Sequence, residues 1–71
     1  MRYRQIIIEY QTKLELNPND PNTLIVLARI FGSLGRYGQA EQYYQQIVQL
    51  DPTNREANRE LKNLRRQQKK L

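Results

Sequence analysis

The side chains that could perform chemistry in this sequence lack the partners that catalysis needs. The chain contains no histidine to act as a neighbouring base and no cysteine to act as a thiolate nucleophile. The same two absences remove the usual zinc ligands. The sequence therefore predicts neither nucleophilic catalysis nor a metal centre, and it indicates no cofactor. The aliphatic hydroxyls left without a base are those of Thr12, Thr23, Ser33 and Thr53.

A pair of carboxylates is the next candidate for chemistry. Glu56 and Glu60 stand one helical turn apart, a spacing that could serve acid–base work. Basic residues surround them, so we expect surface ion pairs within that segment instead. We predict that the protein is not an enzyme. The neighbouring cations are Arg55, Arg59 and Lys62.

The glycines Gly32, Gly35 and Gly38 raise the possibility of a phosphate-binding loop. No lysine follows them at the position that a P-loop requires. Their spacing instead suits a tight turn, with Gly35 in the left-handed conformation that ends a helix. We therefore interpret this segment as a reversal between two antiparallel helices.

The elements that position these residues are helices with clear starts and stops. Asp20 is placed to cap a helix whose first residue is Pro21, where a missing N–H costs nothing. Apolar residues then recur three and four positions apart, as on one face of an α-helix. The residues on this face are Leu24, Leu27, Ala28, Phe31 and Leu34.

Two more helices follow the glycine turn. The first is predicted over about residues 39–50, and Pro52 ends it because proline cannot donate the next helical hydrogen bond. Asn54 can cap the second, predicted over residues 55 to about 70. The apolar positions of this last helix form one narrow stripe of Ala57, Leu61 and Leu64.

The chain also repeats itself at an offset of 34 residues, so that Arg2 lies over Arg36. A period of this length, with helix, tight turn, helix and proline stop, is the pattern of tetratricopeptide repeats. The central segment resembles that family in the order and spacing of its large, small and aromatic positions. The matching residues are Leu24, Leu27, Ala28, Phe31, Ala40, Tyr44 and Pro52.

The resemblance implies an all-α fold of antiparallel helix-turn-helix repeats, an α-solenoid fragment of about four helices. In this reading one domain spans residues 1–71. Residues 2–18 form the second helix of a preceding repeat, residues 21–54 form a complete repeat, and residues 55–70 form a capping helix. Asn58, Lys62 and Arg65 stand where a further repeat would need large, small and aromatic residues, so the last helix is expected to end the array.

The resemblance also implies a scaffold that binds a protein or peptide in a concave groove lined by the first helix of each repeat. A carboxylate of the ligand could bind there through charge-assisted hydrogen bonds. An ordinary solvated helix surface is the alternative for the same residues. The groove candidates are Asn22, Ile25, Arg29, Ser33, Arg59 and Asn63.

The N-terminal helix is expected to have an apolar side that the central repeat cannot cover. Such a patch predicts a homo-oligomer or a truncated longer array, with a monomer as the alternative. Lys13 moderates this side, because the matching position in the complete repeat is Ile47. The self-association candidates are Tyr3, Ile6, Ile8 and Tyr10.

The net charge of +5 comes entirely from residues 55–71, because residues 1–54 carry five basic and five acidic groups. Such a basic helix could bind nucleic acid or an anionic membrane surface. It has no aromatic side chain to stack on bases, so a solubilising cap is the preferred interpretation. An excised or engineered repeat scaffold without a dedicated ligand is a further alternative.

The length and hydropathy of the chain set the remaining limits. A chain of 71 residues buries a thin core, which oligomerisation or a regular helical pattern must support. No segment approaches the roughly 20 apolar residues of a membrane span. We expect a cytoplasmic protein by default.

Overall fold

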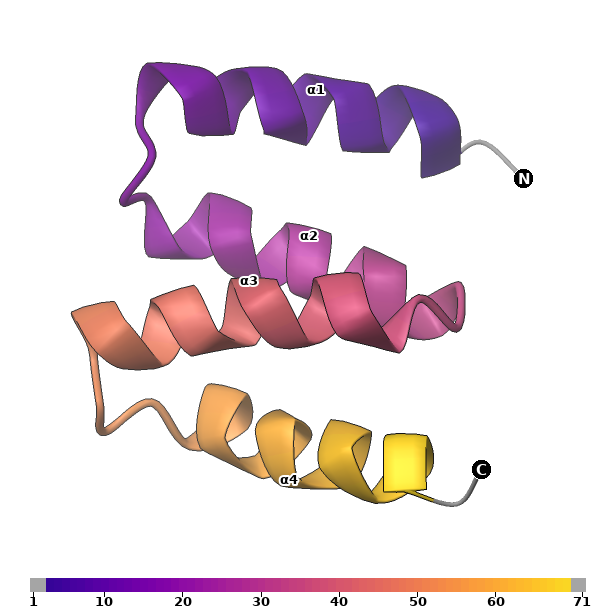
Figure 1. The fold of residues 1–71 in the computed structure, drawn as a ribbon. Coiled ribbons are helices and arrows are strands. Elements are labelled where there is room, and N and C mark those ends of the chain that lie inside the picture. The colour runs from indigo at the N-terminus through magenta and orange to yellow at the C-terminus, as the bar shows by residue number, and fades with distance from the viewer. Residues whose placement is uncertain (1–2, 70–71) are drawn as a thin grey trace.

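Four α-helices lie side by side in chain order across the part of the chain that the computed structural model describes, residues 3–69 (Figure 1). They alternate in direction and form a slab with extents of 34 × 31 × 14 Å. The all-α class and the antiparallel arrangement predicted from the sequence are confirmed. The helices are α1 (Tyr3–Leu16), α2 (Pro21–Ser33), α3 (Tyr37–Leu50) and α4 (Arg55–Lys69).

The start of α2 is the one that the sequence predicts. Asp20 is in an extended conformation, and its Oδ1 accepts a hydrogen bond from the backbone N–H of Asn22 at 3.1 Å. The hydroxyl of Thr23 donates to Asp20 Oδ2 at 2.8 Å. One carboxylate thus binds two donors at the N-terminus of α2, where a negative charge is also favoured by the helix dipole.

The reversal between α2 and α3 is tighter than predicted. Gly35 has a φ of 77°, and the backbone N–H groups of Gly35 and Arg36 donate to the carbonyls of Gly32 and Phe31. This pair of bonds is a Schellman motif, which needs glycine at its left-handed position. The predicted start of the next helix at Gln39 was wrong, because Arg36 already accepts from the N–H of Ala40 and α3 begins at Tyr37.

The connection from α3 to α4 follows the expected pattern. Asp51 adopts an extended conformation before Pro52 and so leaves the helical region. Asn54 Oδ1 accepts from the N–H of Ala57 at 2.9 Å, which confirms Asn54 as the cap of α4. The predicted end of this helix at Lys70, like Arg2 at the other end of the chain, lies outside the described residues.

The core is the seam between α2 and α3. Small and large side chains alternate there, with Ala28 and Ala40 fully buried where the helices come close. Side chains of different size can interdigitate in this way, as they do in close-packed protein cores. The larger residues that fill the seam are Leu24, Leu27, Phe31, Tyr44 and Ile47, all buried.

The outer helices use one face each. In α4 the predicted stripe of Ala57, Leu61 and Leu64 is buried against the core. In α1 no described residue is fully buried, and the helix packs on the core through half-buried side chains. Because the helices lie in one layer, α2 and α3 each have a neighbouring helix on both sides, whereas α1 and α4 have one on a single side. The α1 residues in contact with the core are Ile7, Tyr10 and Leu14.

We expect Phe31→Ala to lower the free energy of unfolding by about 3 to 5 kcal/mol, the usual cost of emptying a buried phenylalanine site. Phe31 is 3% exposed, and its ring stacks on Tyr43 at a centroid distance of 5.7 Å. Urea unfolding followed by circular dichroism measures the change. The control is Ile8→Ala at a 58% exposed position, which should change stability by less than about 0.5 kcal/mol. Equal effects of the two substitutions would contradict this packing.

Candidate functional site: a groove between α2 and α4

An open groove of about 670 Å³ lies between α2 and α4, with side chains of α3 at its base. From α2 it takes Arg29, Gly32 and Ser33, which lie one helical turn apart or next to each other on one face. Tyr37 and Tyr44 come from α3. The opposite wall is α4, which contributes Glu56, Glu60, Asn63, Leu64, Arg66 and Gln67.

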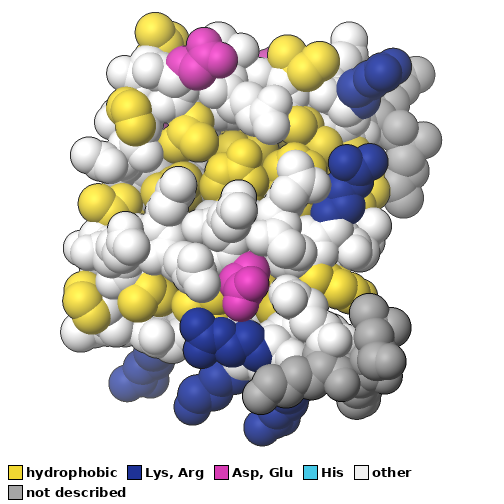
Figure 2. Space-filling model, viewed as in Figure 1, with side chains coloured by type: hydrophobic (Ala, Val, Ile, Leu, Met, Phe, Trp, Pro, Cys, Tyr) yellow, Lys and Arg dark blue, Asp and Glu magenta, His cyan; other side chains and the backbone are white. Residues whose placement is uncertain are grey.

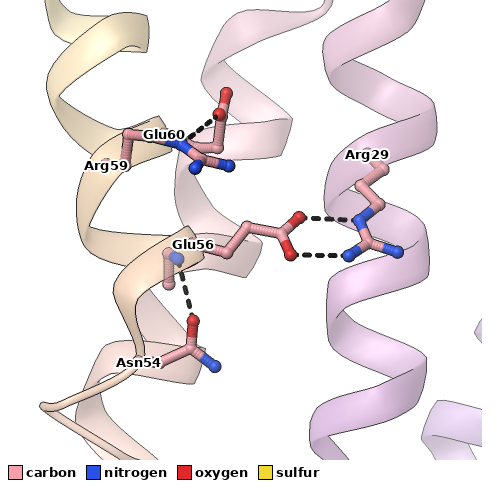
Figure 3. Close-up of polar contacts among 6 residues, drawn as sticks. Arg29, Asn54, Glu56, Arg59 and Glu60 are labelled. Atoms are coloured by element: carbon pink, nitrogen blue, oxygen red, sulfur yellow. Dashed lines mark hydrogen bonds and ion pairs between the residues drawn. The ribbon is translucent and has the colours of Figure 1, made fainter.

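A bidentate ion pair between Arg29 and Glu56 joins the two walls of this groove (Figure 3). Arg29 Nε donates to Glu56 Oε2 at 2.6 Å, and Arg29 Nη2 donates to Glu56 Oε1 at 2.5 Å. This is the planar arrangement in which arginine binds carboxylates most strongly. Glu56 also lies in the first turn of α4, where the helix dipole favours an anion.

The pair shifts the pKa values of both partners. The hydrogen bond to Arg29 holds the pKa of Glu56 below its ordinary value, although partial burial acts in the opposite direction. The hydrogen bond to Glu56 raises the pKa of Arg29. Both groups are therefore charged at neutral pH, and each compensates the charge of the other.

The ion pairs expected within α4 need one correction. Arg59 Nε and Glu60 Oε2 do lie 3.3 Å apart on the surface of α4. Glu56, however, pairs with Arg29 of α2 and not with a cation of its own helix. The reason is that packing of α4 on α3 brings its first turn opposite α2, an approach that helical spacing alone does not report.

Tyr44 connects the groove to the core. Its side chain is 4% exposed yet contributes to the lining of the groove. Burial, followed by the nearby carboxylates of Glu60 and Glu56, raises the pKa of Tyr44 to about 12. The phenol is therefore neutral under physiological conditions and can donate a hydrogen bond.

The structure brings together half of the predicted groove residues. Arg29, Ser33 and Asn63 line the groove, whereas Asn22 and Ile25 of α2 are not among its lining residues. Arg59 pairs with the lining residue Glu60 without lining the groove itself. Their role in binding stays a prediction.

Sequence reasoning missed several lining residues. It interpreted Tyr44 only as a core residue, and Glu56 and Glu60 only as surface carboxylates. The available signal was that Glu56, Glu60 and Asn63 recur at helical spacing on the polar face of α4. Nothing in that pattern showed that α2 lies opposite this face.

The threonine hydroxyls have structural partners. Thr12 donates to the carbonyl of Ile8 at 2.9 Å, Thr23 to Asp20, and Thr53 to Asp51 Oδ1 at 2.7 Å. They support helix and turn geometry. Within residues 3–69, no cluster of carboxylates suited to a metal ion was found, and no helix has the length and apolar character needed to cross a membrane.

The self-association candidates on α1 divide between two environments. Ile6 and Ile8 are 38% and 58% exposed and line a hollow of about 660 Å³ together with Gln5, Glu9 and Thr12. Tyr10 is half-buried against the core, and the Lys13 ammonium lies 4.6 Å from its ring centroid. Tyr3 is half-buried and lines a different hollow, toward α3.

The cations of α4 gather at one edge of the slab, where Figure 2 shows basic side chains along that helix. Arg65 pairs with Glu41 of α3 at 3.5 Å, and Arg59 pairs with Glu60. These two arginines thus have part of their charge compensated within the chain.

The helices define a helical repeat protein with an open groove between α2 and α4. Residues 21–54, which comprise α2, α3 and their flanking turns, match the family model described as tetratricopeptide repeat. This segment belongs to the tetratricopeptide repeat family, and the four helices together form a fragment of that all-α repeat fold. Proteins of this family generally mediate protein–protein interactions and are generally not catalysts. A comparison with curated protein sequences found no match.

We expect Glu56→Gln to lower the free energy of unfolding at pH 7 by about 0.5 to 1 kcal/mol, a modest value because Arg29 is largely exposed. The pKa of Glu56 is lower in the folded state than its ordinary 4.5, so the stabilisation is present above pH 4.5. It is lost as the pH falls through the lowered value.

Urea midpoints of the wild type and the variant, measured from pH 7 to pH 3, test this dependence. The difference between them should stay constant down to about pH 5 and then shrink. Glu15→Gln, at an exposed carboxylate of α1 outside the ion pairs, is the control. A difference that grows in acid would show that the pair does not stabilise the fold.

Proposed function

We propose that the chain is a non-catalytic interaction module that binds a peptide segment of another protein in the groove between α2 and α4. The observation that supports this most is the groove itself, which has a volume of about 670 Å³ and walls fixed by the Arg29–Glu56 pair. A ligand that enters a pre-formed site loses less free energy to ordering than one that must build it.

The polar groups of the groove suit a peptide backbone. Asn63 and Gln67 offer amide donors and acceptors, Ser33 offers a hydroxyl, and Tyr44 offers a neutral phenol. Leu64 and the aromatic side chains supply apolar contact beside them. A segment with both N–H and C=O groups can satisfy such a mixture.

The ion pairs argue against a ligand chosen mainly for negative charge. An acidic group bound to Arg29 would have to displace Glu56 or share its cation. Arg66 also lines the groove, but Glu56 and Glu60 line it too, so the lining residues carry no net positive charge. Breaking a hydrogen-bonded charge pair leaves one charge without its partner. The proposal is therefore a peptide recognised through its backbone and apolar side chains.

Selection of peptides from a random library, with the intact chain as bait, tests the groove. We expect the tryptophan of Asn63→Trp to fill the groove. The affinity for the selected peptides should then fall at least about tenfold, a loss of roughly 1.4 kcal/mol of binding free energy. Gln42→Trp, at an exposed position of α3 outside the groove, is the matched control and should leave binding unchanged. Peptides that bind both variants equally would overturn the proposal.

Self-association through α1 is a second candidate, favoured by the exposure of Ile6 and Ile8 at one hollow. Pairing of such faces between copies would remove apolar surface from water. We expect Ile6→Gln to shift the monomer–oligomer equilibrium toward monomer in sedimentation experiments over a range of concentrations. Leu16→Gln, at an 83% exposed position of the same helix, should not. A wild type that stays monomeric at the highest concentration would eliminate this candidate.

A further inference from the structure

A second apolar hollow, separate from the groove, lies between the N-terminal halves of α1 and α3. We refer to this hollow of about 510 Å³ as the α1–α3 trough. The apolar residues that line it are Phe31 of α2, the C-cap residue Leu34, and Tyr3, Ile7 and Ile8 of α1. Figure 2 shows apolar side chains gathered between α1 and α3 on this face of the slab. The trough shares no lining residue with the groove between α2 and α4.

The apolar surface of the trough is accessible. Ile8 is 58% exposed and Leu34 is 41% exposed, although Phe31 beside them is buried. Leu34 is the C-cap residue of α2, and the Schellman motif that follows it fixes the backbone at this point. A ligand would therefore meet a pre-formed apolar surface.

One end of the trough is positively charged without compensation. Arg4 and Arg36 both line it, and within residues 3–69 neither has a carboxylate within 4.0 Å. The first turns of α1 and α3 contain no acidic residue, and the side chain of Arg36 forms no hydrogen bond that caps α3. Figure 1 shows that both helices begin on the same side of the slab. The positive ends of the two helix dipoles thus add to the positive potential of the two guanidinium groups.

We propose that the α1–α3 trough is a docking site for an amphipathic helix of a partner protein, with apolar side chains on one face and aspartate or glutamate residues at its C-terminal end. The apolar side chains would cover Ile8 and Leu34, next to the buried ring of Phe31. The carboxylates and the negative end of the helix dipole would lie beside Arg4 and Arg36. A hollow between two parallel helices receives a third helix by the general helix-in-groove mode.

The charges of the chain favour a foreign acidic helix over a second copy. Residues 55–71 carry the net charge of +5 and residues 1–54 are neutral overall, so neither part of a second copy brings net negative charge to Arg4 and Arg36, which have no carboxylate within 4.0 Å among the described residues. The concave form of the site also suits one inserted element better than a flat anionic membrane. A partner with its own carboxylates satisfies both the apolar and the charged part of the site.

Two synthetic peptides of about 15 residues, close to the length of α1, test this proposal. Both have leucines at helical spacing on one face, and their last turns carry either glutamates or lysines. We expect the glutamate peptide to bind the intact chain about tenfold more tightly, since two exposed ion pairs and two helix ends contribute modestly each. Its binding should shift the amide NMR signals of Ile8, Leu34 and Gln39, which line the trough.

The double variant Arg4→Glu/Arg36→Glu should reverse the preference, so that the lysine peptide binds more tightly. Glutamates near the N-termini of α1 and α3 suit the helix dipoles, so the variant is expected to fold. Arg55→Glu/Lys62→Glu makes the same change of charge on α4 and should preserve the wild-type preference. Neither residue lines the trough.

Three outcomes would overturn the proposal. The first is equal affinity for the two peptides. The second is a set of shifts confined to Tyr44 and Asn63, which would place the peptides in the groove instead. The third is displacement of the glutamate peptide by self-association of the chain, which would assign the trough to a second copy.

Discussion

The fold depends on the close approach of α2 and α3 along a seam of small and large side chains. Ala28 and Ala40 lie in the core with no exposed surface, and this lets Leu27 and Phe31 interdigitate with Tyr44 and Ile47. The outer helices have no core of their own, because each buries only one face. Both candidate binding surfaces therefore depend on this seam: α3 forms the base of the groove, and the end of α2 lines the trough.

The two surfaces differ in how their arginines are compensated. In the groove, Arg29 is held by Glu56 and serves to connect α2 with α4. At the trough, Arg4 and Arg36 have no carboxylate within salt-bridge distance among the described residues, and the nearby helix starts add positive potential. Arg66 also lines the groove, where Glu56 and Glu60 balance the two arginines, whereas the lining of the trough contains no carboxylate. This contrast favours backbone recognition in the groove and carboxylate recognition at the trough.

The exposure of α1 and the basic character of α4 give the two ends of the slab different physical properties. α1 presents Ile6 and Ile8 to solvent, whereas α4 presents cations, two of which pair with Glu41 and Glu60. Apolar surface favours contact between molecules, and a highly charged helix opposes further stacking. The assignment of α1 to a preceding repeat and of α4 to a cap stays a prediction that accords with this difference.

The sequence by itself determined the four helices except for the start of α3, the caps of α2 and α4, and most residues of the core. Leu34 was predicted on the apolar face of α2 but is 41% exposed, because the helix ends at Ser33. Asp20, Gly35, Pro52 and Asn54 act within a few positions of themselves, and helical periodicity marks the buried face, so both kinds of signal can be followed along the chain. Only the tertiary structure decided which residues from different helices meet. The pairing of Arg29 with Glu56, 27 positions apart, and the gathering of Arg4 and Arg36 at one trough follow from how α2 and α4 lie on α3 and how α1 lies on α2. The distances between residues of different helices result from packing along the whole seam, so they cannot be predicted from a local sequence pattern.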